Sequence, residues 1–424
     1  MELQFDLTNL LAKPGEAQRT GAEKAMKTLL ANPHGWPLGW IDLDARKAEI
    51  PEVNDALDSC SGADTLVTIG MGGSGLGTRA LASLFATSMG SGIFQGANGR
   101  RLVVLDNLDE ANAARVREEL AGAKAALNPV SKSGTTLETI ANLLTLLSSA
   151  PESHLVATTG DPDSPIGRLA AARHAPILLV PDDVGGRFSV LTSVGLFPLA
   201  FIGVDVAGLL EGAAGARDAF IDEAADSNPA LELAAHIFSL HRDRAVSQMF
   251  FLPYCEAMYD FGRWWQQLFA ESLGKRKSLD GRDIFTGLTP VAALGPSDQH
   301  SLLQLLLEGP DDKLTAFIEV EKPSRDAGAF AAIPPELAEF SYLRGKRIHD
   351  IVRAELAGTR QSLANQGRPN YTLTLPSLST RAVGEMLFFF MLVTGLLGVM
   401  FNVNAFDQPA VQESKQLTRR NLSS

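Results

Sequence analysis

The densest group of polar side chains in the sequence is the segment Ser131–Thr136 (SKSGTT). Its four hydroxyl groups, glycine and lysine fall between an expected strand and an expected helix, so the first N–H groups of that helix would point at the same spot. Hydroxyl donors and the positive end of a helix suit a phosphate monoester bound without a metal ion. An ordinary helix cap would explain only one or two of the hydroxyls. We therefore predict a phosphate site at this turn.

A glycine-rich segment, Gly70–Gly77 (GMGGSGLG), also follows an expected strand and opens a helix. It satisfies the GxGxxG pattern of dinucleotide-binding turns, which need an acidic residue about 20 residues later at the end of a second strand. Asp106 is the nearest candidate and lies further on. A structural tight turn is another interpretation. A third is a turn whose N–H groups, with the hydroxyl of Ser74, approach an anion or a sugar.

Two charged side chains have surroundings that suit acid–base chemistry. Arg187 follows Gly185 and Gly186, so its guanidinium could enter a crevice and stabilise a developing oxyanion. Glu271 lies near the end of an aromatic-rich expected helix, on the same helical face as Gln267. A carboxylate beside apolar residues can act as a general base. A surface arginine and a solvated glutamate are the simpler alternatives for each motif taken alone.

A histidine and a C-terminal lysine complete the candidate residues. His300 lies at an expected strand-to-helix turn, and histidine can transfer protons near neutral pH. Gln408 and Lys415 are two turns apart on one face of an expected terminal helix over residues 409–420, whose first turn suits Pro409. The alternatives are a structural histidine and a solvated amphipathic tail.

Short apolar strands that alternate with helices would position these turns. The first block of the chain has expected strands at 65–70, 101–105, 126–130, 154–158 and 176–180, with helices at 78–87, 110–121 and 136–147. A helix at 17–30 precedes it, and a helical stretch at about 189–240 follows it. The second block has strands at 247–252, 314–319 and 371–375, with helices ending near 270 and over 299–307 and 337–357. This alternation predicts an α/β protein with parallel sheets covered on both faces.

The apolar segment 386–401 (MLFFFMLVTGLLGVMF) resembles a membrane span but falls slightly short of the roughly 18–20 residues that are needed. We interpret it as a helix buried in a large core. The N-terminus lacks the pattern of a signal peptide. The net charge of −12 weighs against nucleic acid and membrane surfaces as partners. Two cysteines, Cys60 and Cys255, without a metal-binding pattern indicate a cytoplasmic protein without disulfides or zinc.

Taken in order, these six segments resemble the glucose-6-phosphate isomerase family over about residues 70–415. The resemblance implies two SIS-type three-layer αβα sandwiches with mainly parallel sheets and helical arms at both termini. The implied division is an N-terminal arm (1–60), a first SIS-type domain (61–205), a second SIS-type domain with linking helices (206–400) and a C-terminal arm (401–424). A homodimer with active sites shared between the subunits, and no metal or cofactor, is also implied.

The resemblance further implies reversible isomerisation of glucose 6-phosphate and fructose 6-phosphate through a cis-enediol. Glu271 matches the catalytic base, and Arg187 matches the residue that steadies the enediolate. His300, supplied by the partner subunit, and Lys415 match the residues that open the sugar ring. The implied substrate-contacting residues are Gly73, Ser74, Ser131, Lys132, Ser133, Thr136, Gln267 and Gln408. Ser133-Gly134 replaces the Thr-Phe usual in the family, which leaves activity on mannose 6-phosphate open.

Two other classes of protein stay open at this stage. A non-catalytic sugar-phosphate sensor would need the Ser131–Thr136 turn, but not Glu271, His300 and Lys415 together. A nicotinamide-dependent oxidoreductase would use the Gly70–Gly77 turn for its cofactor. The joint presence of the acid–base residues favours the isomerase over both.

Overall fold

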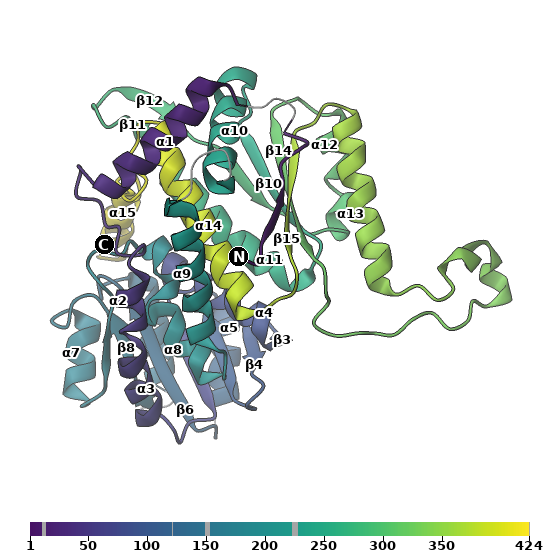
Figure 1. The fold of residues 1–424 in the computed structure, drawn as a ribbon. Coiled ribbons are helices and arrows are strands. Elements are labelled where there is room, and N and C mark those ends of the chain that lie inside the picture. Colours follow the sequence, from purple (N-terminus) through teal and green to yellow (C-terminus); the bar gives the residue numbers. More distant parts are fainter. Residues whose placement is uncertain (11–13, 121, 149–152, 223–227, 424) are drawn as a thin grey trace.

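The chain folds into two α/β sandwiches that are joined by a shared layer of helices (Figure 1). The computed structural model describes residues 1–10, 14–120, 122–148, 153–222 and 228–423. The expected α/β class with mainly parallel sheets is confirmed. The position of the domain boundaries stays a prediction.

The first sheet has eight strands in the order β3-β4-β5-β2-β6-β8-β9, and β7 also pairs with β6. All pairs are parallel except β3 with β4 and β4 with β5. The strands are β2 (Thr65–Ile69), β3 (Thr87–Gly90), β4 (Ile93–Gln95), β5 (Arg101–Leu105), β6 (Ala125–Ser131), β7 (His154–Leu155), β8 (Ala157–Thr159) and β9 (Ile177–Leu179). The strands expected from sequence are thus confirmed, although the strand expected at 154–158 is two short strands.

Helices cover both faces of this sheet. Successive side chains of β2 alternate between two cores: Leu66 belongs to the large central core, whereas Val67 and Ile69 belong to a smaller outer core. The outer core is closed by α5 (Glu110–Leu120), α6 (Leu137–Leu147) and α7 (Pro165–Ala172). On the central side lie α2 (Leu43–Lys47), α3 (Ile50–Ser59), α4 (Leu76–Phe85) and α8 (Ser193–Phe201). Residue 121, the last of the helix expected at 110–121, lies outside the described residues.

The second sheet has five strands in the order β1-β15-β14-β10-β13. Its strands are β1 (Gln4–Asp6), β10 (Gln248–Pro253), β13 (Thr289–Ala292), β14 (Lys313–Val320) and β15 (Asn370–Leu375). Only β1 runs antiparallel to its neighbour, so the N-terminal segment contributes an edge strand that the sequence analysis did not predict. A separate hairpin joins β11 (Lys275–Lys277) and β12 (Asp283–Thr286).

The helices of the second sandwich also lie on both sides of the sheet. On the outer side, α12 (Leu303–Glu308) and α13 (Ile348–Asn365) pack on Phe250, Leu252 and Phe317. On the central side lie α1 (Glu16–Ala31), α10 (Pro229–Arg244) and α11 (Tyr259–Leu273). The helical stretch expected at 189–240 is α8, α9 (Val206–Asp222) and α10, and its residues 223–227 lie outside the described residues.

The apolar segment at 386–401 belongs to α14 (Thr380–Met400), which runs through the central layer (Figure 1). Within the described chain it is the helix long and apolar enough to cross a membrane, but 89% of its most apolar window is buried inside the fold. The interpretation as a core helix is therefore confirmed. The chain ends in α15 (Val411–Ser423), close to the helix expected at 409–420.

One prediction was wrong: the polar helix expected at 337–357 does not form as one element. Residues Pro335–Leu343 form an irregular 3-10 segment. The helical conformation is interrupted at Gly345, which has a φ of 75°, and α13 begins only at Ile348. This interruption of the helix is stabilised by an antiparallel β-bridge between Ala329 and Arg347. Because Gly345 adopts a left-handed conformation, a continuous helix cannot pass through it. Residues 321–347 project from the body instead (Figure 1).

The crossing of α9 and α14 requires glycine at two positions. A Cβ added to Gly212 would lie 2.0 Å from the carbonyl oxygen of Arg381, and one added to Gly384 would lie 2.0 Å from that of Leu209. Both contacts are with backbone, which cannot move without separating the helices. The absence of a side chain at these positions therefore sets the distance between the two helices.

We predict that Gly212→Ala lowers the free energy of unfolding by about 1–3 kcal/mol, although alanine favours helices, because overpacking must push α9 from α14. Gly215→Ala in the same helix is the matched control, since nothing lies within 4 Å of its added Cβ. The control should be neutral or more stable by about 0.5–1 kcal/mol. Chemical denaturation and the Tm of both variants check this, and equal effects would contradict the packing argument.

Candidate active site

The buried guanidinium of Arg187 is the centre of the site. The side chain of Arg187 follows Gly186 at the start of the 3-10 segment η2 (Gly186–Leu191), and the residue is 4% exposed. Its Nε donates to Ser272 Oγ at 2.7 Å, and its Nη1 donates to Gln408 Oε1 at 2.9 Å. Its Nη2 donates to the carbonyls of Ala405 and Asp407. These bonds fix the plane of the guanidinium and join α11, η2 and the C-terminal segment.

The carboxylate of Glu271 lies against this arginine near the end of α11. Its Oε2 is 3.4 Å from Arg187 Nη1, and its Oε1 accepts a hydrogen bond of 3.1 Å from Gln267 Nε2. The side chain remains 37% exposed, so the carboxylate is oriented by two partners and still accessible from outside. Burial lowers the pKa of Arg187, while the charges of Glu271 and Asp407 oppose that shift.

The glycine-rich turn packs closely against both of these elements. A Cβ on Gly73 would lie 2.3 Å from the carbonyl oxygen of Gly186, and one on Gly72 would lie 2.8 Å from Gln267 Nε2. Ser74 ends the same short 3-10 segment, η1 (Gly72–Ser74). The glycines thus bring the turn onto the residues that position Arg187 and Glu271.

Asp106, the acidic residue considered for a dinucleotide ribose, has a different partner. Its carboxylate forms an ion pair of 2.7 Å with Arg79 on α4. Arg79 Nε also lies 3.5 Å from Asp260 at the start of α11, so this pair helps to join the two sandwiches. The geometry thus favours a packing role for the glycine-rich turn over dinucleotide binding.

The hydroxyl groups of residues 131–136 converge where β6 ends and α6 begins. Ser131 Oγ lies 2.8 Å from Thr136 Oγ1 and 3.5 Å from Ser133 Oγ, and Ser133 Oγ lies 3.0 Å from Thr135 Oγ1. Gly134 has a φ of +61°, and a Cβ there would lie 2.0 Å from Ser164 Oγ. The turn therefore gathers its hydroxyls at a helix N-terminus, as an anion requires.

Lys132 points to a different part of the site than its neighbours. Its Nζ donates to the backbone carbonyls of Asp182 at 2.8 Å and Val184 at 2.9 Å. Burial lowers the pKa of the Lys132 ammonium, against the attraction of Asp182 and Asp183. Lys132 thus ties the hydroxyl turn to the segment that leads into Gly185, Gly186 and Arg187.

The C-terminal helix closes the site on the side of the hydroxyl turn. A cavity of about 140 Å³ lies between them. It is lined by Ser133, Thr135, Thr136, Leu137, Glu138, Ser414, Lys415, Thr418 and Arg419. Lys415, expected near the reacting sugar, therefore lies beside the predicted phosphate turn.

His300 is not brought to this cluster within one chain. It ends the exposed 3-10 segment η5 (Ser297–His300), and no hydrogen bond or ion pair within the described residues links it to Arg187, Glu271 or Gln408. The turn that carries His300 is nevertheless stabilised by Asp298, which accepts hydrogen bonds from Leu294 N at 2.8 Å and from Ser301 Oγ at 2.7 Å.

Ser272 and Lys275 belong to the cluster but were not predicted as site residues from the sequence. Ser272 accepts from Arg187, and Lys275 Nζ donates to the Glu271 carbonyl at 2.8 Å and lies 3.1 Å from Asp407 Oδ1. Burial lowers the pKa of Lys275. The spacing of Glu271 and Lys275, one helical turn, was the available signal.

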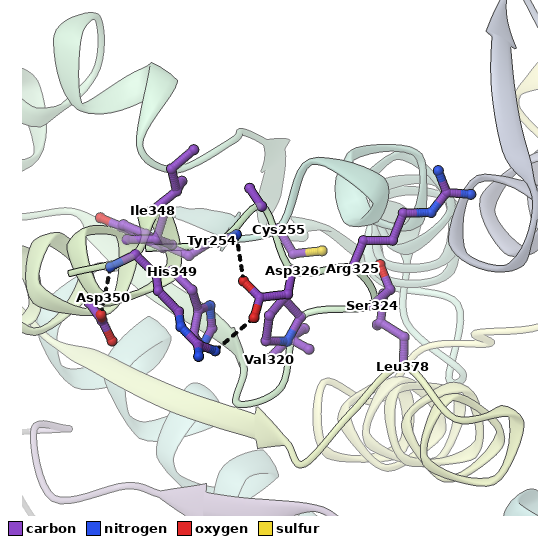
Figure 2. Close-up of a pocket in the computed structure, with 15 residues that line it drawn as sticks. Tyr254, Cys255, Val320, Ser324, Arg325, Asp326, Ile348, His349, Asp350 and Leu378 are labelled. Carbon is purple, nitrogen blue, oxygen red and sulfur yellow. Dashed lines mark hydrogen bonds and ion pairs between the residues drawn. The ribbon is translucent and has the colours of Figure 1, made fainter. Parts of the chain in front are cut away.

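Outside this cluster, a larger hollow of about 410 Å³ lies at the base of the projecting segment, near Tyr254, Cys255 and His349 (Figure 2). The Asp326 carboxylate, which is labelled in Figure 2, forms an ion pair of 2.9 Å with Arg347 there. None of the predicted site residues lines this hollow. Across the described residues, no group of three or more His, Cys, Asp and Glu side chains is placed to hold a metal ion.

Two α/β sandwiches, a hydroxyl-rich turn at a helix N-terminus and an exposed carboxylate beside a buried arginine are together typical of phosphosugar isomerases. A sequence model of the phosphoglucose isomerase family matches residues 59–424. The chain belongs to the phosphoglucose isomerase family.

Individual relatives agree with this assignment. The chain is 37% identical to a glucose-6-phosphate isomerase of Thermus thermophilus, over 99% of this chain and 100% of that one. It is 35% identical to the enzyme of the same name from Carboxydothermus hydrogenoformans, over 83% of this chain and 77% of the relative. A solved structure of a hypothetical protein from Thermus thermophilus superposes with a TM-score of 0.88 at 36% identity, covering all of both chains. A Chlamydia trachomatis glucose-6-phosphate isomerase, with a TM-score of 0.74 and 24% identity over 89% of this chain and 73% of that chain, shares the fold.

We predict that Lys132→Met lowers kcat by about tenfold with little change in KM, because the segment before Arg187 loses two charged hydrogen bonds. Lys132→Arg, which keeps donors at this position, should retain more of the activity. Steady-state kinetics with a sugar phosphate measure both constants. A raised KM with normal kcat would instead make Lys132 a direct phosphate ligand.

Proposed function

We propose that this isomerase interconverts glucose 6-phosphate and fructose 6-phosphate. The observation that carries the proposal is the carboxylate of Glu271, held by Arg187 at 3.4 Å and Gln267 at 3.1 Å yet still exposed. Relatives that carry this enzyme's name match nearly the whole chain. Such an enzyme works in glycolysis and gluconeogenesis.

In the proposed reaction, the hydroxyls of Ser131, Ser133 and Thr136 bind the phosphoryl group of the substrate at the N-terminus of α6. Lys132 supports this turn and fixes the adjoining segment. Gly73 and Ser74 line the sugar site, and Gln408 and Gln267 contact the substrate while holding Arg187 and Glu271. This arrangement places the C1–C2 bond of the open sugar opposite the carboxylate of Glu271.

Glu271 removes the proton from C2 of the aldose, and the electrons of that C–H bond form the C1–C2 double bond of a cis-enediolate. The charge on its oxygen is stabilised by the guanidinium of Arg187. Return of this proton to C1, together with transfer of the hydroxyl proton from O2 to O1, gives the ketose, so the atoms balance without an external oxidant or reductant. In this scheme, Lys415 and His300 transfer the protons that open the sugar ring.

We expect Glu271→Gln to lower kcat by at least about 100-fold, since a positioned general base contributes about 10²–10⁴-fold. Binding of inorganic phosphate should persist, because the hydroxyl turn is unchanged. Glu118→Gln on the exposed side of α5 is the control and should have normal activity. The measurement is a coupled assay in the presence of EDTA, and normal turnover of the Glu271 variant would contradict the assigned base.

The assembly is proposed to be a homodimer in which His300 acts in the partner subunit's site. Two features support this: the exposed place of His300, and the apolar side chains on the projecting segment 321–347. Of these, Leu337 is 47% exposed and Tyr342 is 67% exposed. Burial of such side chains on a second copy would be favourable.

Mixing two inactive variants tests the shared site. Glu271→Gln and His300→Ala dimers should each be nearly inactive, but subunit exchange creates hybrid dimers in which one site has both residues. We expect about a quarter of the wild-type activity to return, because half the dimers are hybrids with one intact site each. Absence of recovery, with exchange verified by two affinity tags, would show that His300 acts within its own chain.

A cytoplasmic location is proposed for the enzyme. The chain has two cysteines, Cys60 and Cys255, and both are unpaired, which fits a reducing compartment. The burial of α14 inside the fold supports the same location.

A further inference from the structure

The predicted phosphate turn has no free cation of its own. Its single lysine, Lys132, uses its ammonium on the carbonyls of Asp182 and Val184, away from the hydroxyl groups. A phosphate monoester carries a charge of about −1.5 to −2 at neutral pH. Hydroxyls and helix N–H groups supply hydrogen bonds to it, but only partial positive charge. The balancing charge must therefore come from another segment.

The C-terminal helix α15 brings two cations to this place. Lys415 and Arg419 both line the cavity of about 140 Å³ that is walled on the other side by Ser133, Thr135 and Thr136. The two residues are one helical turn apart and share a face of α15, which explains why both reach the same cavity. Arg420, the next residue, is displaced by about 100° around the helix and does not line the cavity.

The guanidinium of Arg419 is available for a ligand. Within the described part of the chain it makes no ion pair and no side-chain hydrogen bond; only its backbone carbonyl accepts from Ser423. The carboxylate of Glu138, which also lines the cavity, forms no ion pair with it in the same part of the structure. A charged fork of donors therefore faces a cluster of hydroxyls without an existing partner.

We propose that Arg419 is a further phosphate-binding residue, whose guanidinium contacts the phosphoryl oxygens held by the Ser131–Thr136 turn. The inference rests on the proposed function and adds a ligand to its phosphate site. A guanidinium binds two phosphoryl oxygens at once, which a lysine ammonium does not. Together, Arg419 and Lys415 balance the phosphate charge and offset the nearby carboxylate of Glu138. Substrate binding thereby holds α15 against the first sandwich.

Comparison of Arg419→Gln with Arg420→Gln tests the proposal. Both remove one positive charge from the same exposed helix, but only Arg419 lines the cavity. We expect Arg419→Gln to raise KM for the sugar phosphate and the inhibition constant of inorganic phosphate by about tenfold, because a charge-assisted hydrogen bond is lost. The kcat of this variant should change much less. Arg420→Gln should leave all three constants unchanged.

Glu138 provides the second arm of the experiment. If Arg419 only neutralised this carboxylate, Glu138→Gln would restore phosphate affinity to Arg419→Gln. Under the proposal, Arg419→Gln weakens phosphate binding by the same factor with or without Glu138→Gln. Restoration, or equal effects of the Arg419 and Arg420 variants, would overturn the assignment.

Failure of the proposed function and failure of the Arg419 assignment give different experimental results. Calorimetric titration with inorganic phosphate measures the site without turnover. An unaltered chain that binds phosphate but does not isomerise glucose 6-phosphate would contradict the proposed function. An active chain whose phosphate affinity is insensitive to Arg419 would contradict only the further inference.

Discussion

The structure of the site depends on one buried cation. Arg187 lies on a short segment between the two sandwiches and donates to α11, through Ser272, and to the C-terminal segment, through Gln408 and two carbonyls. A buried charge is tolerated only where it is fully hydrogen-bonded, so each of these partners must be in place. The same guanidinium orients the Glu271 carboxylate. Assembly of the two sandwiches and orientation of the Glu271 carboxylate are therefore the same physical event.

The rest of the fold holds the segments around this cation at the correct distances. The glycines at 72 and 73 allow the first sandwich to approach Gln267 and Gly186, and α14 fills the central layer between the sheets. Lys132 connects the hydroxyl turn to the loop before Arg187. The Ser131–Thr136 turn and Arg187 are thus positioned relative to each other by contacts that involve the backbone, and under the proposed function these contacts set the distance between phosphate and enediolate.

Local patterns in the sequence were sufficient to predict most of the helices and strands. Buried strands such as β2 and β5, and helices such as α1 and α6, have the apolar runs and periodicity from which they were predicted. The edge strand β1 and the short strands β3 and β4 were missed, since their pairing partners rather than their own residues define them. The helix expected at 337–357 failed because the left-handed conformation of Gly345 overrides helix propensity.

The segments that form the site could be predicted from the sequence, but the spatial arrangement of their side chains could not. Arg187 and Glu271 are 84 residues apart, and no spacing rule brings them together. The side chain of Lys132 turns toward backbone carbonyls that carry no signal in the sequence. Ser272 and Lys275 lay inside a recognised motif, yet their contacts with Arg187 and Asp407 bridge long distances in the sequence. The positions and partners of these side chains are therefore determined by tertiary contacts and not by local residue types.

The carbonyls of Ala405 and Asp407 under the Arg187 guanidinium have a consequence for biosynthesis. A ribosome makes these residues after every strand of both sheets, so the sheets can begin to fold first. Until these carbonyls are in place, Arg187 lacks two of its acceptors, although both sandwiches are nearly complete. A chain shortened before Ala405 would therefore retain every strand of both sheets, yet leave the buried charge of Arg187 without these two acceptors.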